Sequence, residues 1–158
     1  MRLSVILLLL LTAPAPRADA AAAKKAEADR AWPSFYAAFR GAVRRRDREA
    51  LRRMMPAEFD YSDDGGDDDG DGDSRDEAFG RWDESRGRGW KVFERLLRGG
   101  AVPGEGRLGS HNGTPQRVAP PAINKRVNVV SGRIAWYAVF EFREDRRWYC
   151  TVFKECCD

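Results

Sequence analysis

Residues 134–153, IAWYAVFEFREDRRWYCTVF, have the pattern of two β-strands joined by a tight charged turn. In the first strand, apolar side chains recur at every second position, which is the period of a half-buried strand. The alternation of the second strand places Trp148, Cys150 and Val152 on one face and Phe153 on the other. Two strands alone are marginally stable in water, so this aromatic hairpin needs a cover. The stretch predicts an α+β fold in which N-terminal helices pack on a curved antiparallel sheet that ends in the hairpin.

The first twenty residues have the layout of a signal peptide. Arg2 gives a positive start, residues 3–11 form an apolar core, and residues 18–20 (Ala-Asp-Ala) match the small-x-small cleavage pattern. The apolar core is too short for a stable bilayer span, and no cysteine stands at the cleavage point to carry a lipid. We therefore expect cleavage after Ala20 and an exported product, periplasmic or secreted, without a membrane span in its mature form.

The remaining chain is long enough for one domain. We expect residues 21–31, rich in alanine and charge, to be a flexible or frayed N-terminus, and residues 32–155 to form a single domain. The net charge of +3 hides a basic block at 40–53 and an acidic block at 60–73. The basic block lacks interleaved exposed aromatic residues, so we interpret it as a solvated helix face and expect no nucleic-acid partner.

Several further elements follow from local signals. Trp32-Pro33 is expected to start the first firm helix, because proline is tolerated in a first turn. An aromatic stripe on this helix should face the hairpin. A short strand is expected at 59–61, and Ser74 with Glu77 has the spacing of a capping box at the start of a later helix. We expect 101–121 to be a long loop with a short strand at 117–119.

Residues 63–73, DDGGDDDGDGD, contain only aspartate and glycine, so they have no apolar surface to bury and should form an exposed loop. Asp67, Asp69 and Asp71 match the first three ligand positions of an EF-hand calcium loop. The twelfth position, where that motif has a bidentate glutamate, is Ala78. Loosely bound calcium and a metal-free acidic insertion are the two interpretations; no other cofactor is indicated.

The histidine and cysteine residues give little indication of a catalytic or metal-binding site. His111 is the single histidine and lies in a glycine-rich stretch, where a solvated side chain is the simplest interpretation. The three cysteines are Cys150, Cys156 and Cys157, an odd number for an exported protein. Either they stay unpaired, or Cys156 or Cys157 links two copies of the chain as a homodimer.

Aromatic residues supply the candidate ligand site. Core packing is the default interpretation of side chains at helical and strand spacing, but a long helix and a curved sheet can also enclose an apolar pocket. The candidate pocket residues are Trp32, Phe35, Tyr36, Phe39, Trp136, Phe140 and Trp148.

The order of these elements resembles the nuclear transport factor 2-like superfamily, also called the SnoaL-like or cystatin-like cone fold. The resemblance covers roughly 32–154 and is carried by Phe35-x3-Phe39-x2-Ala42-Val43-x3-Asp47-x2-Ala50-Leu51, Phe59-Asp60-Tyr61-Ser62, Ser74-Arg75-Asp76-Glu77-Ala78-Phe79 and Arg147-Trp148-Tyr149. It implies a long N-terminal helix packed into the concave face of a bent antiparallel sheet. Enzymes of the superfamily place an Asp/His or Asp/Tyr set inside the cone; here the candidates for a general base are Glu141 and Asp60.

Three functions are compatible with the sequence. The leading hypothesis is an exported, non-catalytic binding module for a small apolar ligand or a protein partner. The first alternative is a SnoaL-like isomerase or dehydratase whose general base is a carboxylate, Glu141 or Asp60, in an apolar cavity. The second is a calcium-responsive envelope protein that acts through the Asp/Gly loop.

Overall fold

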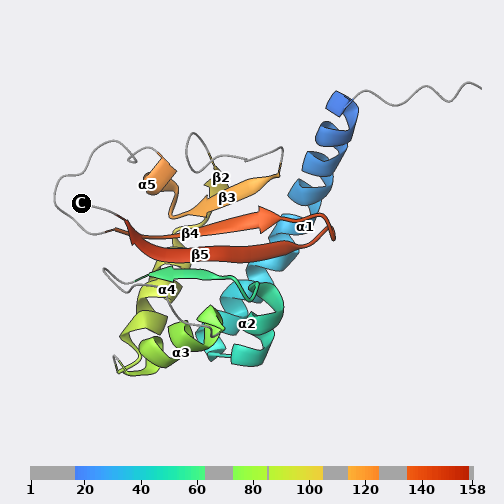
Figure 1. Ribbon diagram of the computed structural model, residues 1–158. Helices are drawn as coiled ribbons and strands as arrows, with labels where there is room; N and C mark the ends of the chain where they lie inside the picture. Colours follow the sequence, from blue (N-terminus) through green and yellow to red (C-terminus); the bar gives the residue numbers. More distant parts are fainter. Residues whose placement is uncertain (1–16, 63–72, 85, 105–113, 125–134, 157–158) are drawn as a thin grey trace, which may run out of the picture.

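The computed structural model describes residues 17–62, 73–84, 86–104, 114–124 and 135–156 (Figure 1). Within these ranges the elements are α1 (Arg17–Arg45), α2 (Arg48–Met54), β1 (Asp60–Ser62), α3 (Ser74–Glu84), α4 (Arg88–Arg98), β2 (Val102–Pro103), β3 (Gln116–Ala119), α5 (Pro121–Asn124), β4 (Ala135–Phe142) and β5 (Trp148–Cys156). Helices pack against a sheet that ends in an aromatic hairpin, so the predicted α+β class is confirmed. Val127, Val129 and Val130 have the spacing of a further strand, but they lie outside the described residues.

The five strands of the described residues form one sheet in the order β1-β5-β4-β3-β2. Three of the neighbouring pairs are antiparallel, as expected, but β1 runs parallel to β5, with Asp60 opposite Val152. The sheet is therefore mixed rather than wholly antiparallel. A parallel pair needs a long crossover connection. Here that connection runs over residues 63–147, so the pairing leaves no local signal in the sequence.

The hairpin β4–β5 forms as expected, with one irregularity that changes a face assignment. Val139 lies opposite Val152, whereas Phe140 lies opposite Cys150, so Thr151 is an extra residue in β5. Such a β-bulge reverses the alternation beyond it. Phe153, not Val152, therefore shares the core face with Cys150, and the predicted alternation is wrong after position 151. The Thr151 hydroxyl donates to the Val139 carbonyl oxygen at 3.4 Å, which satisfies a polar group that is nearly buried.

Helix α1 begins at Arg17, so the expectation that it starts at Trp32 is wrong. Pro33 lies inside the helix and is exposed. The turn before it is held by tertiary contacts: Ala28 is fully buried, and the Trp148 indole Nε1 donates to the Ala28 carbonyl oxygen at 2.9 Å. Alanine-rich sequence favours helix, and contact with the hairpin outweighs the proline.

Helix α3 begins at Ser74, the residue predicted to cap it, so the cap itself lies one residue earlier. Asp73 takes the N-cap role, because its carboxylate accepts a hydrogen bond from the Arg75 backbone N–H at 3.0 Å and its carbonyl accepts from Asp76 and Glu77. Glu77 instead pairs with Arg81, at 3.2 Å. The predicted capping box of Ser74 and Glu77 is therefore replaced by an aspartate cap.

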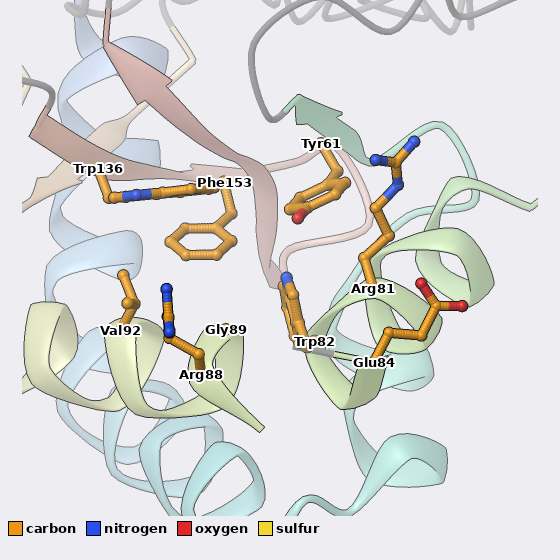
Figure 2. Close-up of a pocket in the computed structure, with 9 residues that line it drawn as sticks. All are labelled: Tyr61, Arg81, Trp82, Glu84, Arg88, Gly89, Val92, Trp136 and Phe153. Carbon is orange, nitrogen blue, oxygen red and sulfur yellow. The ribbon is translucent and has the colours of Figure 1, made fainter. Parts of the chain in front are cut away.

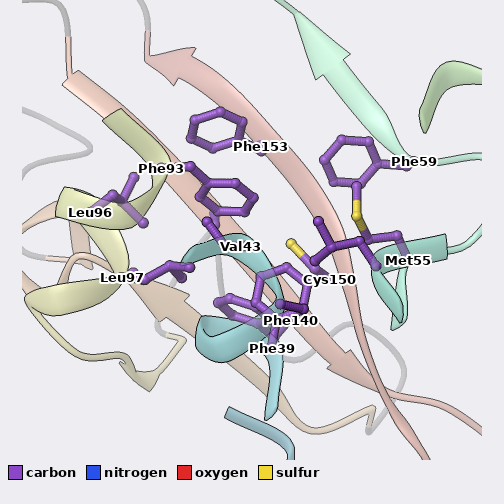
Figure 3. Close-up of a cluster of buried hydrophobic side chains, with 14 of the residues drawn as sticks. Phe39, Val43, Met55, Phe59, Phe93, Leu96, Leu97, Phe140, Cys150 and Phe153 are labelled. Atoms are coloured by element: carbon purple, nitrogen blue, oxygen red, sulfur yellow. The ribbon is translucent and has the colours of Figure 1, made fainter. Parts of the chain in front are cut away.

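The core lies between one face of the sheet and helices α1 to α4, and Figure 3 shows its centre. Phe93 of α4 stacks on Phe153 at 4.0 Å between ring centroids and meets Phe39 of α1 at 5.7 Å. Each fully buried aromatic side chain contributes about 1.5–3 kcal/mol through removal of its surface from water. The same cluster includes Val43, Met55, Phe59, Leu97, Phe140 and Cys150.

Candidate ligand pocket

Six of the seven predicted pocket residues pack against one another between α1 and the hairpin. The Trp32 ring lies 4.8 Å from that of Tyr36, 4.8 Å from that of Trp148 and 5.3 Å from that of Phe140. The Tyr36 hydroxyl donates to the Leu97 carbonyl oxygen at 2.7 Å, and burial raises the pKa of Tyr36 to about 12. The six residues are Trp32, Phe35, Tyr36, Phe39, Phe140 and Trp148. Their rings occupy the interface of helix and sheet as core side chains.

The seventh predicted residue, Trp136, lies in a different place, at a solvent-open cavity of about 370 Å³ between the sheet and α3 and α4 (Figure 2). We call this cavity the aromatic pocket. Its aromatic lining is Tyr61, Trp82, Trp136 and Phe153, and its other lining residues are Arg81, Glu84, Arg88, Gly89 and Val92. Small-molecule sites in proteins are typically clefts of about 300–1,000 Å³ lined mainly by apolar side chains.

Three neighbouring strands supply the aromatic wall that follows the sheet. Tyr61 of β1 and Phe153 of β5 are register partners, and their rings stack with centroids 6.2 Å apart. Trp136 of β4 lies 4.8 Å from Phe153 and 6.3 Å from Tyr61, with its plane within about 30° of both. Phe153 reaches this face only because of the bulge at Thr151. The rings of three strands therefore pack against one another along this wall, and Trp136 is the most exposed of the three.

Close approach of α3 and α4 forms the opposite wall. A Cβ atom on Gly89 would lie 2.5 Å from Trp82 Cδ1 and 2.9 Å from Trp82 Cα, so a larger residue there would push the two helices apart. The Trp90 indole Nε1 donates to Asp83 Oδ1 at 2.8 Å and fixes the same junction. Gly87 ends the connection in the left-handed region, with φ of 70°, which suits glycine. The sequence carries one signal of this wall, the two glycines at positions 87 and 89. From the sequence alone, they indicate only that a helix is interrupted.

Charged side chains form the rim of the aromatic pocket. Arg81 pairs with Glu77, whereas Glu84 and Arg88 are exposed at the mouth. Among the described lining residues, Glu84 is the single carboxylate. The pocket therefore combines an aromatic interior with a mixed-charge entrance, an arrangement that suits binding of an apolar molecule.

Neither predicted general base lies in this pocket. Glu141 accepts a hydrogen bond from Gln116 Nε2 at 2.6 Å, and Asp60 pairs with Lys154 at 2.6 Å. Successive side chains of a strand point to opposite faces, so Glu141 and Asp60 lie on the face of the sheet away from the core and from Tyr61. The structure does not bring these carboxylates together with the aromatic residues.

Other predicted sites fall partly or wholly outside the described residues: Asp67, Asp69, Asp71, His111 and the side chains of Cys156 and Cys157. Within the described part of the chain, no group of three or more His, Cys, Asp or Glu side chains is placed to hold a metal ion. Cys150 is fully buried, and burial raises the pKa of its thiol well above the usual value. None of the described helices is both long and apolar enough to cross a membrane.

No family model matches this chain, and no curated protein or solved structure shows a match. The resemblance to the nuclear transport factor 2-like superfamily therefore stays a prediction, as do the signal peptide and export.

Proposed function

We propose that this protein is an exported, non-catalytic binding module that holds a small, flat, apolar ligand in the aromatic pocket. The observation that carries the proposal is the cluster of Tyr61, Phe153 and Trp136 rings, which pack against one another along one wall of an open cavity of about 370 Å³. A planar molecule can lie against the partly exposed Trp136 ring, with Val92 across the cavity, while the buried Phe153 ring supports Trp136 from beneath.

The physical chemistry favours an aromatic or polycyclic ligand of modest size. Offset stacking of aromatic rings adds about 0.5–1.5 kcal/mol per pair beyond the burial of their area. The cavity volume lies at the small end of the usual range for ligand sites, which suits one or two fused rings. Because the walls are held by Gly89 and by the sheet register, the site is largely formed before the ligand arrives, and binding orders few side chains.

The positions of the carboxylates support binding rather than catalysis. A general base must reach the proton that it removes, within about 3 Å or through one water molecule. Glu141 and Asp60 point away from the aromatic pocket and are engaged by Gln116 and Lys154.

The neutral fluorophore N-phenyl-1-naphthylamine tests this proposal, because its emission rises when it enters an apolar site. We expect saturable binding to the wild-type protein and at least tenfold weaker binding to Trp136→Ala, which corresponds to about 1.4 kcal/mol. Tyr149→Ala is the matched control, because it removes an aromatic side chain from the same sheet outside the pocket lining. It should bind the probe as the wild type does.

Two results would overturn the proposal: no saturable binding by the wild type, or equal losses in Trp136→Ala and Tyr149→Ala. Val92→Trp gives an independent test, because it fills the pocket and leaves the aromatic wall intact. The tryptophan side chain should occupy the space that the probe needs and so abolish binding of the probe. Thermal melting of each variant establishes that it is folded.

A further inference from the structure

A second hollow, of about 400 Å³, lies between α1 and α4 and shares no lining residue with the aromatic pocket. We call it the basic groove. The two helices are held together beneath it by the Phe39–Phe93 contact and by the hydrogen bond from Tyr36 to the Leu97 carbonyl. Its lining is Ala37, Arg40, Gly41, Arg44, Glu94, Leu97 and Arg98.

The charges of the basic groove are not balanced by the protein. Glu94 forms an ion pair with Arg98 across one helical turn, at 3.6 Å. Arg40 and Arg44 form no ion pair with any residue that the structure describes; the Arg40 guanidinium lies 5.8 Å from the centre of the Tyr36 ring. The arginines of α2, by contrast, pair with Asp83, Asp76 and Glu49.

Two features of α1 at this groove weaken the helix. Arg40 and Arg44 are four residues apart, where like charges repel each other on a helix surface. Gly41, between them, lies in the helix interior, where glycine is less favourable than alanine. Packing does not require this glycine, because a Cβ atom there would meet only the end of the flexible Arg45 side chain, at 3.1 Å from Nη1. Residues that destabilise a helix locally and that packing does not require are typical of functional sites.

We infer that the basic groove is a binding site for a phosphate-class oxyanion, with Arg40 and Arg44 as its ligands. The planar guanidinium fork offers paired N–H donors that match the oxygens of a phosphate or phosphomonoester. Bound anion would cancel the repulsion between the two arginines. Gly41 leaves the floor of the groove open, so that the anion can approach both side chains.

Thermal melting of the full chain at constant ionic strength, with sodium chloride replaced by inorganic phosphate, tests this inference. We expect phosphate at about ten times its Kd to raise the wild-type Tm by roughly 4 °C. The double variant Arg40→Gln/Arg44→Gln should lose this shift. Its Tm without phosphate should equal or exceed that of the wild type, because the repulsion is gone.

Arg30→Gln/Arg95→Gln is the matched control. It makes the same change in net charge on the same two helices, at exposed positions outside the groove, and should keep the full phosphate shift. Gly41→Ala should melt at a higher temperature without phosphate and gain less from it. Two results would indicate a general ionic effect and contradict the proposed site. One is an equal rise in Tm for the wild type and Arg40→Gln/Arg44→Gln, and the other is an equal loss of that rise in both double variants.

The chemical source of the oxyanion is distinguished by repeating the titration with phenyl phosphate. If both compounds raise the Tm with the same midpoint concentration, the groove is assigned to free phosphate. A lower midpoint concentration for phenyl phosphate assigns it to a phosphomonoester. Absence of any shift with either compound overturns the inference. None of these outcomes depends on the aromatic pocket, since the groove and the pocket share no lining residue.

Discussion

Arg46 ends α1 with its backbone in the left-handed region, at φ of 54°. Its N–H donates to the Val43 carbonyl at 3.1 Å, and the Asp47 N–H donates to the Ala42 carbonyl at 2.9 Å. These two bonds form a Schellman motif, in which the left-handed position is usually glycine. The arginine side chain has a compensating contact, because its guanidinium lies against Gly87 at the start of α4.

Arg46→Gly should raise the free energy of unfolding by about 1 kcal/mol, because it removes the steric penalty of a side chain in the left-handed region. Arg45→Gly, one residue earlier in helical conformation, should instead lower it by about 0.5–1 kcal/mol. Urea denaturation of the three proteins measures both changes. A loss of stability in both variants would show that the contact of Arg46 with Gly87 outweighs the backbone strain.

Arg75 shows why some important residues carry no sequence signal. Its Nη1 donates to the carbonyl oxygens of Arg52 and Met55 at 2.9 and 3.0 Å, while its Nε donates to Asp73 at 2.7 Å. One side chain thus satisfies the last carbonyls of α2 and supports the first turn of α3. The sequence marks Arg75 only as part of a helix start, because the carbonyls that it reaches lie far earlier in the chain.

At the scale of the element, the unusual feature is the proline inside α1. Pro33 has no N–H to donate to the Asp29 carbonyl, and its ring crowds that carbonyl. The helix nevertheless continues, because the hairpin packs on both sides of the break: Trp148 bonds to Ala28 before it, and Phe140 contacts Tyr36 after it.

Pro33→Ala should therefore raise the free energy of unfolding by up to about 3 kcal/mol, since it restores a helical hydrogen bond at an exposed position. Chemical denaturation of the protein measures the change, and Ser34→Ala, at the exposed neighbouring position, should change stability by only a few tenths of a kcal/mol. A neutral or destabilising effect of Pro33→Ala would place the helix start near Trp32, where proline is favourable.

At the scale of the whole molecule, ion pairs such as Asp29–Arg117 and Glu58–Arg143 join segments that are distant in the chain. Hydrogen bonds from Lys25 and Arg117 lower the pKa of Asp29, and one from Arg143 lowers the pKa of Glu58. The Arg75 side chain likewise lowers the pKa of Asp73 at the cap of α3. Each carboxylate is therefore more acidic in the folded protein than in the unfolded chain.

The sign of the pH dependence follows from these shifts. A carboxylate whose pKa is lowered on folding stabilises the protein above its unfolded pKa, near 4, and loses that effect as the pH falls through its folded pKa. We expect the free energy of unfolding to be nearly constant from pH 7 to pH 5 and to decline below about pH 4.5. Urea denaturation across this range measures the decline, and Glu58→Gln should make it shallower. Stability that increases from pH 5 to pH 3 would contradict the prediction.

The amino-acid sequence by itself determined the α+β class, the hairpin with its turn at 143–146, and the aromatic stripe on α1. These features follow from periods of 2 and 3.6 residues, which are properties of the local backbone. It also predicted a pocket beside α1 with Trp136 in its lining, whereas Trp136 lines a cavity beside α3 and α4.

Only the tertiary structure decided where the candidate sites lie. The bulge at Thr151 turned Phe153 toward Tyr61, the parallel pairing of β1 brought Tyr61 to the pocket, and Gly89 let α4 approach Trp82. The basic groove likewise needs α4 to pack beside α1. Each of these features depends on the register or approach of segments that are distant in the chain, and such contacts are set by the balance of packing over the whole core rather than by any local pattern.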